Sequence, residues 1–237
     1  MADEQTDRQH AAGPRVSGAR AAAPLVGPGP GLLVMDVDST LIEQEVIELI
    51  AEHAGTRGQV AEITARAMRG ELDFAASLRE RVATLAGLPQ KVLSQVRAEA
   101  RPTRGARTLI SALHARGCRV GVVSGGFEEV VAPLADRLGI DHVAANRLEA
   151  CDGVLTGRVL GRIVDREEKV RRLRAWAEAD GVPMERVVAV GDGANDLGMI
   201  AAAGLGIAFC AKPVVVEQAD AAVHVRDLQA VLQLIRS

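Results

Sequence analysis

The chain has 237 residues, of which 48% are hydrophobic and 25% charged, and its formal net charge is −3. This length supports one or two domains with a sizeable core. The sequence contains no Tyr, one Trp and three Phe, so it lacks the basic surface and the stacking residues expected of a nucleic-acid binder. No apolar run reaches the roughly 18 residues of a membrane span. Composition therefore argues against nucleic-acid and membrane partners.

The cysteines and histidines show no metal-binding or disulfide pattern. Cys118, Cys151 and Cys210 are odd in number and far apart, which is typical of reduced thiols in a cytosolic protein. The five His are equally scattered and give no zinc signature. Residues 1–30 lack the apolar segment of a signal peptide. We therefore expect a cytoplasmic protein.

The first hundred residues divide into a tail, a strand and a set of helices. Residues 1–30 are rich in Ala, Gly, Pro and Arg, which predicts a disordered tail without chemistry. Leu32–Met35 is a continuous apolar run, typical of a strand buried on both faces of a parallel sheet. Apolar residues at helical spacing then predict helices from Ile42 to Gly55, from Phe74 to Gly87, and near Val92–Arg101. These helices exceed what a strand-helix-strand crossover needs by about sixty residues, so residues 42–103 are predicted to form an inserted helical cap.

The remainder of the chain alternates helices with short apolar runs, which predicts an α/β fold with a doubly wound parallel sheet. After a helix of roughly Gly105–Arg116, the expected strands are Val120–Val123, His142–Ala145, Val187–Val190, Leu205–Phe209 and Ala221–Val225. Asp152-Gly153 separates two further runs, Arg147–Cys151 and Val154–Val159, and is typical of a hairpin turn. The core is therefore predicted to comprise residues 31–41 and 104–237.

Polar residues follow several of these strands. Asp36 and Asp38 come directly after the first strand, and side chains two apart on an extended chain share a side. Ligands of open α/β sheets bind beyond the carboxyl ends of such strands, although Asp, Ser and Thr at this place also cap helices or form turns. Asn146 and Ser124-Gly125-Gly126 also follow predicted strands. Ser124-Gly125-Gly126 precedes a helix that starts near Glu128, so its hydroxyl and backbone N–H groups can hold an anion at the N-terminus of that helix.

The loop Gly191–Asp196, with the sequence GDGAND, is a second acidic feature. Two carboxylates in so short a loop are costly without a cation, and oxygen ligands without Cys or His indicate Mg²⁺ rather than zinc. The alternative is a solvated acidic loop.

Together these motifs resemble a known family. Asp36-Val37-Asp38-Ser39-Thr40, Ser124-Gly125, Lys169 and GDGAND, in this order, are similar to the four motifs of the haloacid dehalogenase superfamily. More narrowly, SLRERV (77–82), VVSGGF (122–127), ANRL (145–148) and AFCAKP (208–213) resemble the phosphoserine phosphatase family, and the resemblance runs from about Leu32 to the C-terminus. It implies a Rossmannoid core with a helical cap and a Mg²⁺-dependent hydrolysis of O-phospho-L-serine to L-serine and phosphate, the last step of serine biosynthesis.

The resemblance also assigns roles to the aspartates. It implies that Asp36 is the nucleophile that forms an aspartyl-phosphate, which splits a difficult hydrolysis into two easier steps. Asp38 is implied as the general acid and base, because a serine alkoxide leaves poorly unless it is protonated. Mg²⁺ would be held by Asp36, Asp192 and the backbone carbonyl of Asp38.

The phosphoryl group would be held by Lys169, Ser124, Gly125 and Asn195. Lys169 is one of only three Lys in a chain with 25 Arg, which favours a required point charge, as Lys supplies at phosphate sites. The alternative is that it lies on a solvated basic helix face.

Two charged residues in the predicted cap suit the other end of phosphoserine. Arg81 lies seven residues after Phe74, on the same helical stripe, and suits bidentate capture of a carboxylate. Glu45 lies three residues after Ile42, at the inward edge, and is the expected ammonium partner, whereas Glu48 should face solvent. Both could instead be amphipathic side chains at a helix edge.

The sequence leaves other functions open. A phosphotransferase that passes the phosphoryl group to an alcohol such as homoserine, or a phosphatase of a related ester such as phosphohomoserine, would use the same first half-reaction. A non-catalytic binding protein on this fold is a third possibility, because fold does not fix function. The expected partner is a small-molecule substrate, and the sequence predicts no oligomeric state.

Overall fold

The computed structural model describes residues 16–17 and 29–235. Most of the tail predicted at residues 1–30 therefore lies outside the described residues. Within it, Val16–Ser17 form the short strand β1, which pairs antiparallel with β8.

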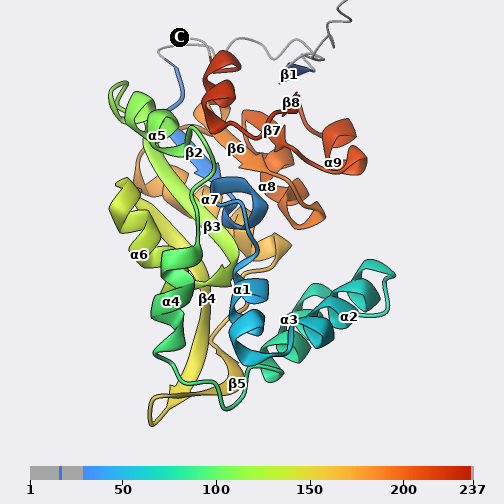
Figure 1. The fold of residues 1–237 in the computed structure, drawn as a ribbon. Helices are drawn as coiled ribbons and strands as arrows, with labels where there is room; N and C mark the ends of the chain where they lie inside the picture. Colours follow the sequence, from blue (N-terminus) through green and yellow to red (C-terminus); the bar gives the residue numbers. More distant parts are fainter. Residues whose placement is uncertain (1–15, 18–28, 236–237) are drawn as a thin grey trace, which may run out of the picture.

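The centre of the molecule is an eight-stranded sheet with the order β1-β8-β7-β6-β2-β3-β4-β5 (Figure 1). Strands β8, β7, β6, β2, β3 and β4 run parallel, whereas the edge strands β1 and β5 pair antiparallel with their neighbours. The remaining strands are β2 (Leu32–Met35), β3 (Arg119–Phe127), β4 (His142–Cys151), β5 (Val154–Leu160), β6 (Val187–Gly191), β7 (Leu205–Phe209) and β8 (Ala221–Val223). The predicted doubly wound α/β sheet is thus confirmed.

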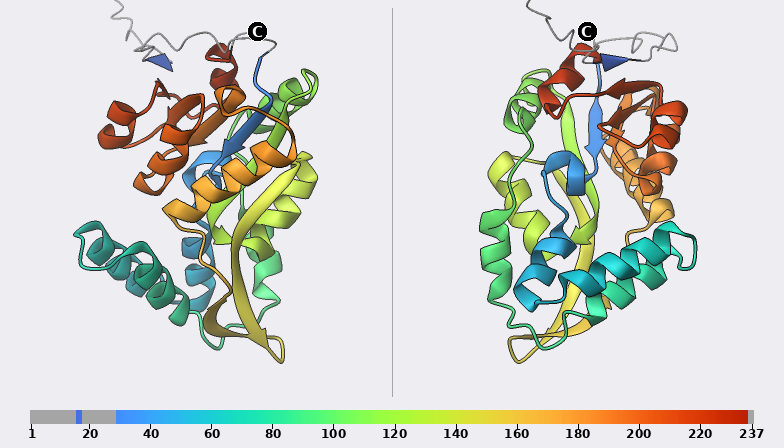
Figure 2. Two further views of the ribbon diagram at one scale, coloured as in Figure 1. Left: turned by 180° about the vertical axis from the view of Figure 1, so that it is seen from behind. Right: turned by 45° about the vertical axis from the view of Figure 1, so that its right-hand side comes forward.

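Helices cover both faces of this sheet (Figures 1 and 2). They are α1 (Val46–Ala54), α2 (Arg57–Met68), α3 (Phe74–Ala83), α4 (Val92–Glu99), α5 (Ala106–His114), α6 (Glu128–Leu138), α7 (Arg166–Ala179), α8 (Leu197–Ala202) and α9 (Pro213–Gln218), with short helical turns η1 (Val37–Leu41), η2 (Met184–Arg186), η3 (Ala194–Asp196) and η4 (Leu228–Gln233). In the part of the chain that is described, none of these helices has the length and apolar character to cross a bilayer.

Strand β2 shows why the core has two layers. Its four residues are all fully buried. Successive side chains point to opposite faces of the sheet, and both of these faces are covered by helices. Leu33 and Met35 pack in the cluster that contains α5 and α6, whereas Leu32 and Val34 pack in the cluster that contains α7 and α8. The prediction that this continuous apolar run forms a strand buried on both faces is therefore confirmed.

Strands β4 and β5 form the predicted hairpin. Asp152 and Gly153 at its turn have φ values of 51° and 76°, the left-handed pair that this turn type requires. Asn146 was expected at the end of its strand. It lies within β4 instead, because this strand continues into the hairpin. Its buried side chain instead donates to Gly125 O and accepts from Val164 N, each at 2.8 Å.

The segment 42–103 contains α1 to α4. Figure 2 shows α2 and α3 as a helical hairpin that projects from the rest of the molecule. Helix α2 was not predicted, because Val60 is its only buried residue and leaves no apolar stripe to recognise. Helix α1 begins at Val46, so the helical periodicity from Ile42 was wrong: Ile42 instead pairs with Pro102 in a β-bridge, where the chain enters and leaves the segment.

The tight layering predicts a contrast between two glycines. A Cβ at Gly206 in β7 would lie 2.4 Å from the carbonyl oxygen of Ile200, so Gly206→Ala should lower the free energy of unfolding by about 1–3 kcal/mol. Exposed Gly58 in α2 meets nothing within 4 Å, so Gly58→Ala should raise it by about 0.5–1 kcal/mol. Urea unfolding followed by circular dichroism measures both, and equal effects would contradict this packing.

Candidate active site

The site lies beyond the carboxyl ends of β2 and β6. These strands pair in parallel register, with Met35 opposite Val190. Asp36 follows β2, and its backbone N–H donates to Val190 O at 3.0 Å. Asp192 follows β6 in the same way. The two aspartates therefore meet at one sheet edge because their strands end at the same level.

Lys169 lies beneath this edge, between two carboxylates. Its Nζ donates to Asp36 Oδ1 and to Asp196 Oδ1, each at 2.6 Å, and its side chain is 0% exposed. It projects from α7, whose neighbouring Arg171 and Arg172 pair with Glu168. The alternative of a solvated basic face is thus wrong for Lys169, which is the member of the basic run that faces inward.

Burial shapes the ionisation of this triad. Burial raises the pKa of Asp36 well above its usual value, and the charge of Asp196 adds to this while Lys169 opposes it. Burial alone would lower the pKa of Lys169, but Asp196 and Asp36 outweigh it and raise that pKa above its ordinary value. Lys169 therefore stays cationic, and one cation is shared between two buried carboxylates.

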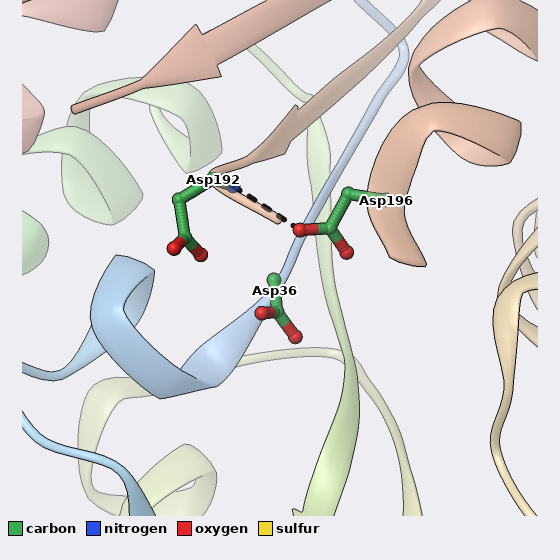
Figure 3. A group of neighbouring side chains, drawn as sticks. All are labelled: Asp36, Asp192 and Asp196. Atoms are coloured by element: carbon green, nitrogen blue, oxygen red, sulfur yellow. Dashed lines mark hydrogen bonds between the residues drawn. The ribbon is translucent and has the colours of Figure 1, made fainter. Parts of the chain in front are cut away.

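Carboxylate oxygens of Asp36, Asp192 and Asp196 all lie within 4.8 Å of one another and could hold a metal ion (Figure 3). The oxygens of Asp196 are already engaged: Oδ1 accepts from Lys169, and Oδ2 accepts from the backbone N–H groups of Asp192 and Gly193 at 3.1 and 3.0 Å. Asp36 and Asp192 are therefore the better donors. Hard oxygen donors of this kind suit a divalent cation such as Mg²⁺.

Asp38 stands apart from the cluster. Its Oδ1 accepts from Val46 N at 3.0 Å, at the start of α1. Burial raises the pKa of Asp38 to about 8, and the charge of Glu45 contributes. A carboxyl group that holds its proton at neutral pH can donate it, as a general acid must. The alternative of a turn-forming or capping residue also has support, because Asp38 does bind the first N–H of α1.

A cavity of about 340 Å³ opens above the aspartates. The residues predicted from the sequence that line it are Asp36, Asp38, Glu45, Arg81, Gly125, Asp192 and Asn195. Ser124 and Lys169 are fully buried behind its wall. Ser124 Oγ accepts from Gly126 N at 2.8 Å, which leaves its hydroxyl hydrogen free to donate. The structure therefore gathers all the predicted residues at one site.

Glu45 and Arg81 face the cavity from different elements. Glu45 lies immediately before α1, and its Oε1 accepts from Ser39 Oγ at 2.7 Å. Arg81 lies in α3 and donates to Ser77 O at 3.3 Å. Burial lowers the pKa of the Arg81 guanidinium, partly offset by Glu45 and Asp38. No carboxylate among the described residues comes within 4.0 Å of it, so its charge is available to a ligand.

Some residues of the site were missed or misjudged from the sequence. Glu48 was expected to face solvent; it is exposed, yet it also lines the cavity. Lys212 lines the cavity too; it lies in the AFCAKP motif quoted for the family resemblance, but it was not assigned to the site. Thr40 Oγ1 donates to Asp192 Oδ1 at 3.1 Å, a contact between residues far apart in the chain that no local pattern indicates.

Comparison with known proteins agrees with this geometry. The family model described as haloacid dehalogenase-like hydrolase matches residues 33–201. A phosphoserine phosphatase of Streptococcus thermophilus is 54% identical over 86% of this chain and 95% of its own length. The chain belongs to the haloacid dehalogenase-like hydrolases, and within them to the phosphoserine phosphatase family.

Other phosphoserine phosphatases differ from this chain in length, and two solved structures contain an intermediate analogue or a substrate. A phosphoserine phosphatase of Streptomyces coelicolor is 61% identical over 86% of this chain but 50% of its own length, so the chain spans about half of that relative. A solved phosphoserine phosphatase with a phospho-aspartyl intermediate analogue is 44% identical, with a TM-score of 0.83 over 88% of this chain and 100% of its own. Another phosphoserine phosphatase structure, 43% identical with a TM-score of 0.83 over 87% of this chain and 99% of its own, is substrate-bound.

The raised carboxylate pKa values predict a link between pH, metal and stability. The pKa of Asp192 is raised to about 6 by burial and by Asp196, and that of Asp38 to about 8. Because folding favours the protonated forms, the metal-free protein should lose stability as the pH rises from about 5 to about 8. Mg²⁺ binds the deprotonated carboxylates, so it should raise the Tm more at the higher pH.

Thermal unfolding in EDTA and in Mg²⁺ at both pH values measures this effect. Asp192→Asn removes one titrating donor and should shrink the Mg²⁺-induced rise in Tm. An equal rise at both pH values in the wild type would contradict the link.

Proposed function

We propose that this chain is a Mg²⁺-dependent phosphatase that hydrolyses O-phospho-L-serine to L-serine and phosphate. The observation that carries the proposal is a single cavity lined by two chemically distinct sets of groups. One set is the carboxylate of Asp36, which Lys169 binds from behind, and the other is the oppositely charged pair Glu45 and Arg81. These two sets match a small ester that carries both a phosphate and the ammonium and carboxylate groups of an amino acid.

The reaction begins with the carboxylate of Asp36 as nucleophile. Its Oδ1 is held by Lys169, which fixes the orientation of the group for attack on phosphorus. A bond forms between an Asp36 oxygen and phosphorus as the bond from phosphorus to the serine oxygen breaks. Asp38 gives its proton to the departing oxygen, then removes a proton from the water that hydrolyses the aspartyl-phosphate.

The phosphoryl oxygens meet donors on several elements. We assign this role to Lys169, which binds Asp36, to the Ser124 hydroxyl, and to the Gly125 backbone and the Asn195 amide, which both line the cavity. Mg²⁺, held by Asp36, Asp192 and the carbonyl of Asp38, would supply positive charge that reduces repulsion between the nucleophile and the phosphate. The carboxylate cluster fits this ion, because three aspartates share the single cation Lys169, and burial together with the charge of Asp196 raises the pKa of Asp36 and of Asp192.

The amino-acid end of the substrate is recognised by two opposite charges. Arg81 suits the carboxylate, because a guanidinium offers two parallel N–H donors. Glu45 suits the ammonium group. Arg81 lies on the projecting α2–α3 hairpin whereas Glu45 lies next to the core, so a bound serine moiety would bridge them. In this role residues 42–103 act as a cap that shields the reaction from water.

The same proposal places the protein in the cytoplasm. Support comes from the three cysteines, which are all free thiols, since disulfides are rare in that compartment.

The primary test is phosphate release from O-phospho-L-serine in Mg²⁺ and in EDTA. Turnover is expected in Mg²⁺ and should vanish in EDTA, and Asp36→Asn should abolish it while the far-ultraviolet circular dichroism stays unchanged. Glu43→Gln, at an exposed carboxylate outside the cavity, is the control and should keep full activity. Turnover by Asp36→Asn would contradict the assignment of Asp36 as the nucleophile. Phosphate transfer to added homoserine in place of water would favour the phosphotransferase alternative.

The Arg81 assignment makes a separate prediction. Loss of a bond to a charged group is worth about 1.5–3 kcal/mol, so Arg81→Ala should raise KM for phosphoserine about tenfold to a hundredfold. O-phosphoethanolamine has no carboxylate and should be affected much less. Arg79→Ala, at an exposed position of the same helix, is the matched control. Equal losses on both esters would argue against carboxylate recognition.

A further inference from the structure

Ser39 lies in the turn η1 that follows Asp36, and its side chain contacts Glu45, the residue proposed to bind the ammonium group. Its Oγ donates to Glu45 Oε1 at 2.7 Å. Both side chains are only partly buried, and among the described residues no donor reaches the other oxygen of Glu45, Oε2. The hydroxyl therefore fixes one carboxylate oxygen and leaves the other available.

The backbone at Ser39 suggests that its side chain is needed. Its φ is +56°, in the left-handed region that glycine occupies without penalty and other residues rarely adopt. Such conformations persist only where the surrounding structure holds them, and they cluster at functional sites. Serine at this position keeps a hydroxyl that glycine would lack.

The loop does not need the hydroxyl to close. Ser39 N donates to Gln44 O at 3.1 Å, and Arg226 donates to Ser39 O at 2.9 Å. The start of α1 is also satisfied without Glu45, because Asp38 accepts from Val46 N and the Glu45 side chain makes no capping bond. The bond from Ser39 to Glu45 is thus left with one evident effect, the orientation of a carboxylate that lines the cavity.

We propose that Ser39 is a positioning residue that sets the selectivity for the substrate ammonium group by holding Glu45 in the cavity. The inference rests on the proposed function, since it requires Glu45 to bind the ammonium. Without the hydroxyl, Glu45 loses a charge-assisted hydrogen bond and gains rotamer freedom, both of which weaken binding rather than chemistry.

The test is Ser39→Gly, which suits the left-handed backbone conformation and removes the hydroxymethyl side chain, including the hydroxyl that binds Glu45. KM for O-phospho-L-serine should rise about tenfold, with kcat little changed. KM for 3-phosphooxypropionate, the analogue without the amine, should stay near its wild-type value, and the Tm should be unchanged or higher. Asp152→Gly is the matched control: it also replaces a left-handed residue, with φ of +51°, but lies in the hairpin turn away from the cavity, so it should leave both KM values unchanged.

A double-mutant cycle with Glu45→Ala completes the test. If Ser39 acts through Glu45, Ser39→Gly should add no further rise in KM once Glu45 is removed. An additive rise, an equal rise for the amine-free analogue, or an unchanged KM in Ser39→Gly would overturn the positioning role and leave the proposed function standing. A wild-type protein without phosphoserine turnover, or Glu45→Ala with unchanged KM, would overturn both.

Discussion

The ion pairs of Lys169 with Asp36 and Asp196 hold this site together. Removing either partner from a buried ion pair leaves an uncompensated charge and destabilises a protein by about 3–5 kcal/mol. Lys169 thereby joins three segments that are distant in the chain: the end of β2, helix α7 and the loop after β6. It orients Asp36, the proposed nucleophile, through one oxygen, and through Asp196 it fixes the loop that carries Asp192. The arrangement of Asp36, Asp192 and Asp196 therefore depends on this one cation.

The substrate pocket is divided between a fixed part and a projecting part. Glu45 is bound to Ser39 in the turn η1 that follows Asp36, and the β-bridge between Ile42 and Pro102 pairs the two ends of the 42–103 segment close by. Arg81 is carried by the α2–α3 hairpin, which extends from the molecule (Figure 2). A substrate that contacts both therefore connects the two parts. Selectivity for an amino acid and enclosure of the reaction can then arise from the same contacts.

Much of this arrangement could be predicted from the sequence because it follows from strand ends. The apolar runs before Asp36 and Asp192 identify buried parallel strands, and parallel strands bring their carboxyl ends to one edge. The burial of Lys169 could not be read from its strongly basic helix without the family resemblance. The bond from Ser39 to Glu45 was missed because it needs a left-handed residue that only the backbone reveals. Helix α2 was missed because it lacks an apolar face.

Covalent phosphorylation of Asp36 is the step on which the proposed reaction depends. It can be measured by quenching the enzyme in acid during turnover of O-phospho-L-serine, digesting it and locating the phosphoryl group by mass spectrometry. We expect an acid-stable, hydroxylamine-sensitive acyl phosphate on Asp36, which is absent from Asp36→Asn. A phosphoryl group on Ser39 or Ser124 in place of Asp36, or turnover by Asp36→Asn, would contradict it.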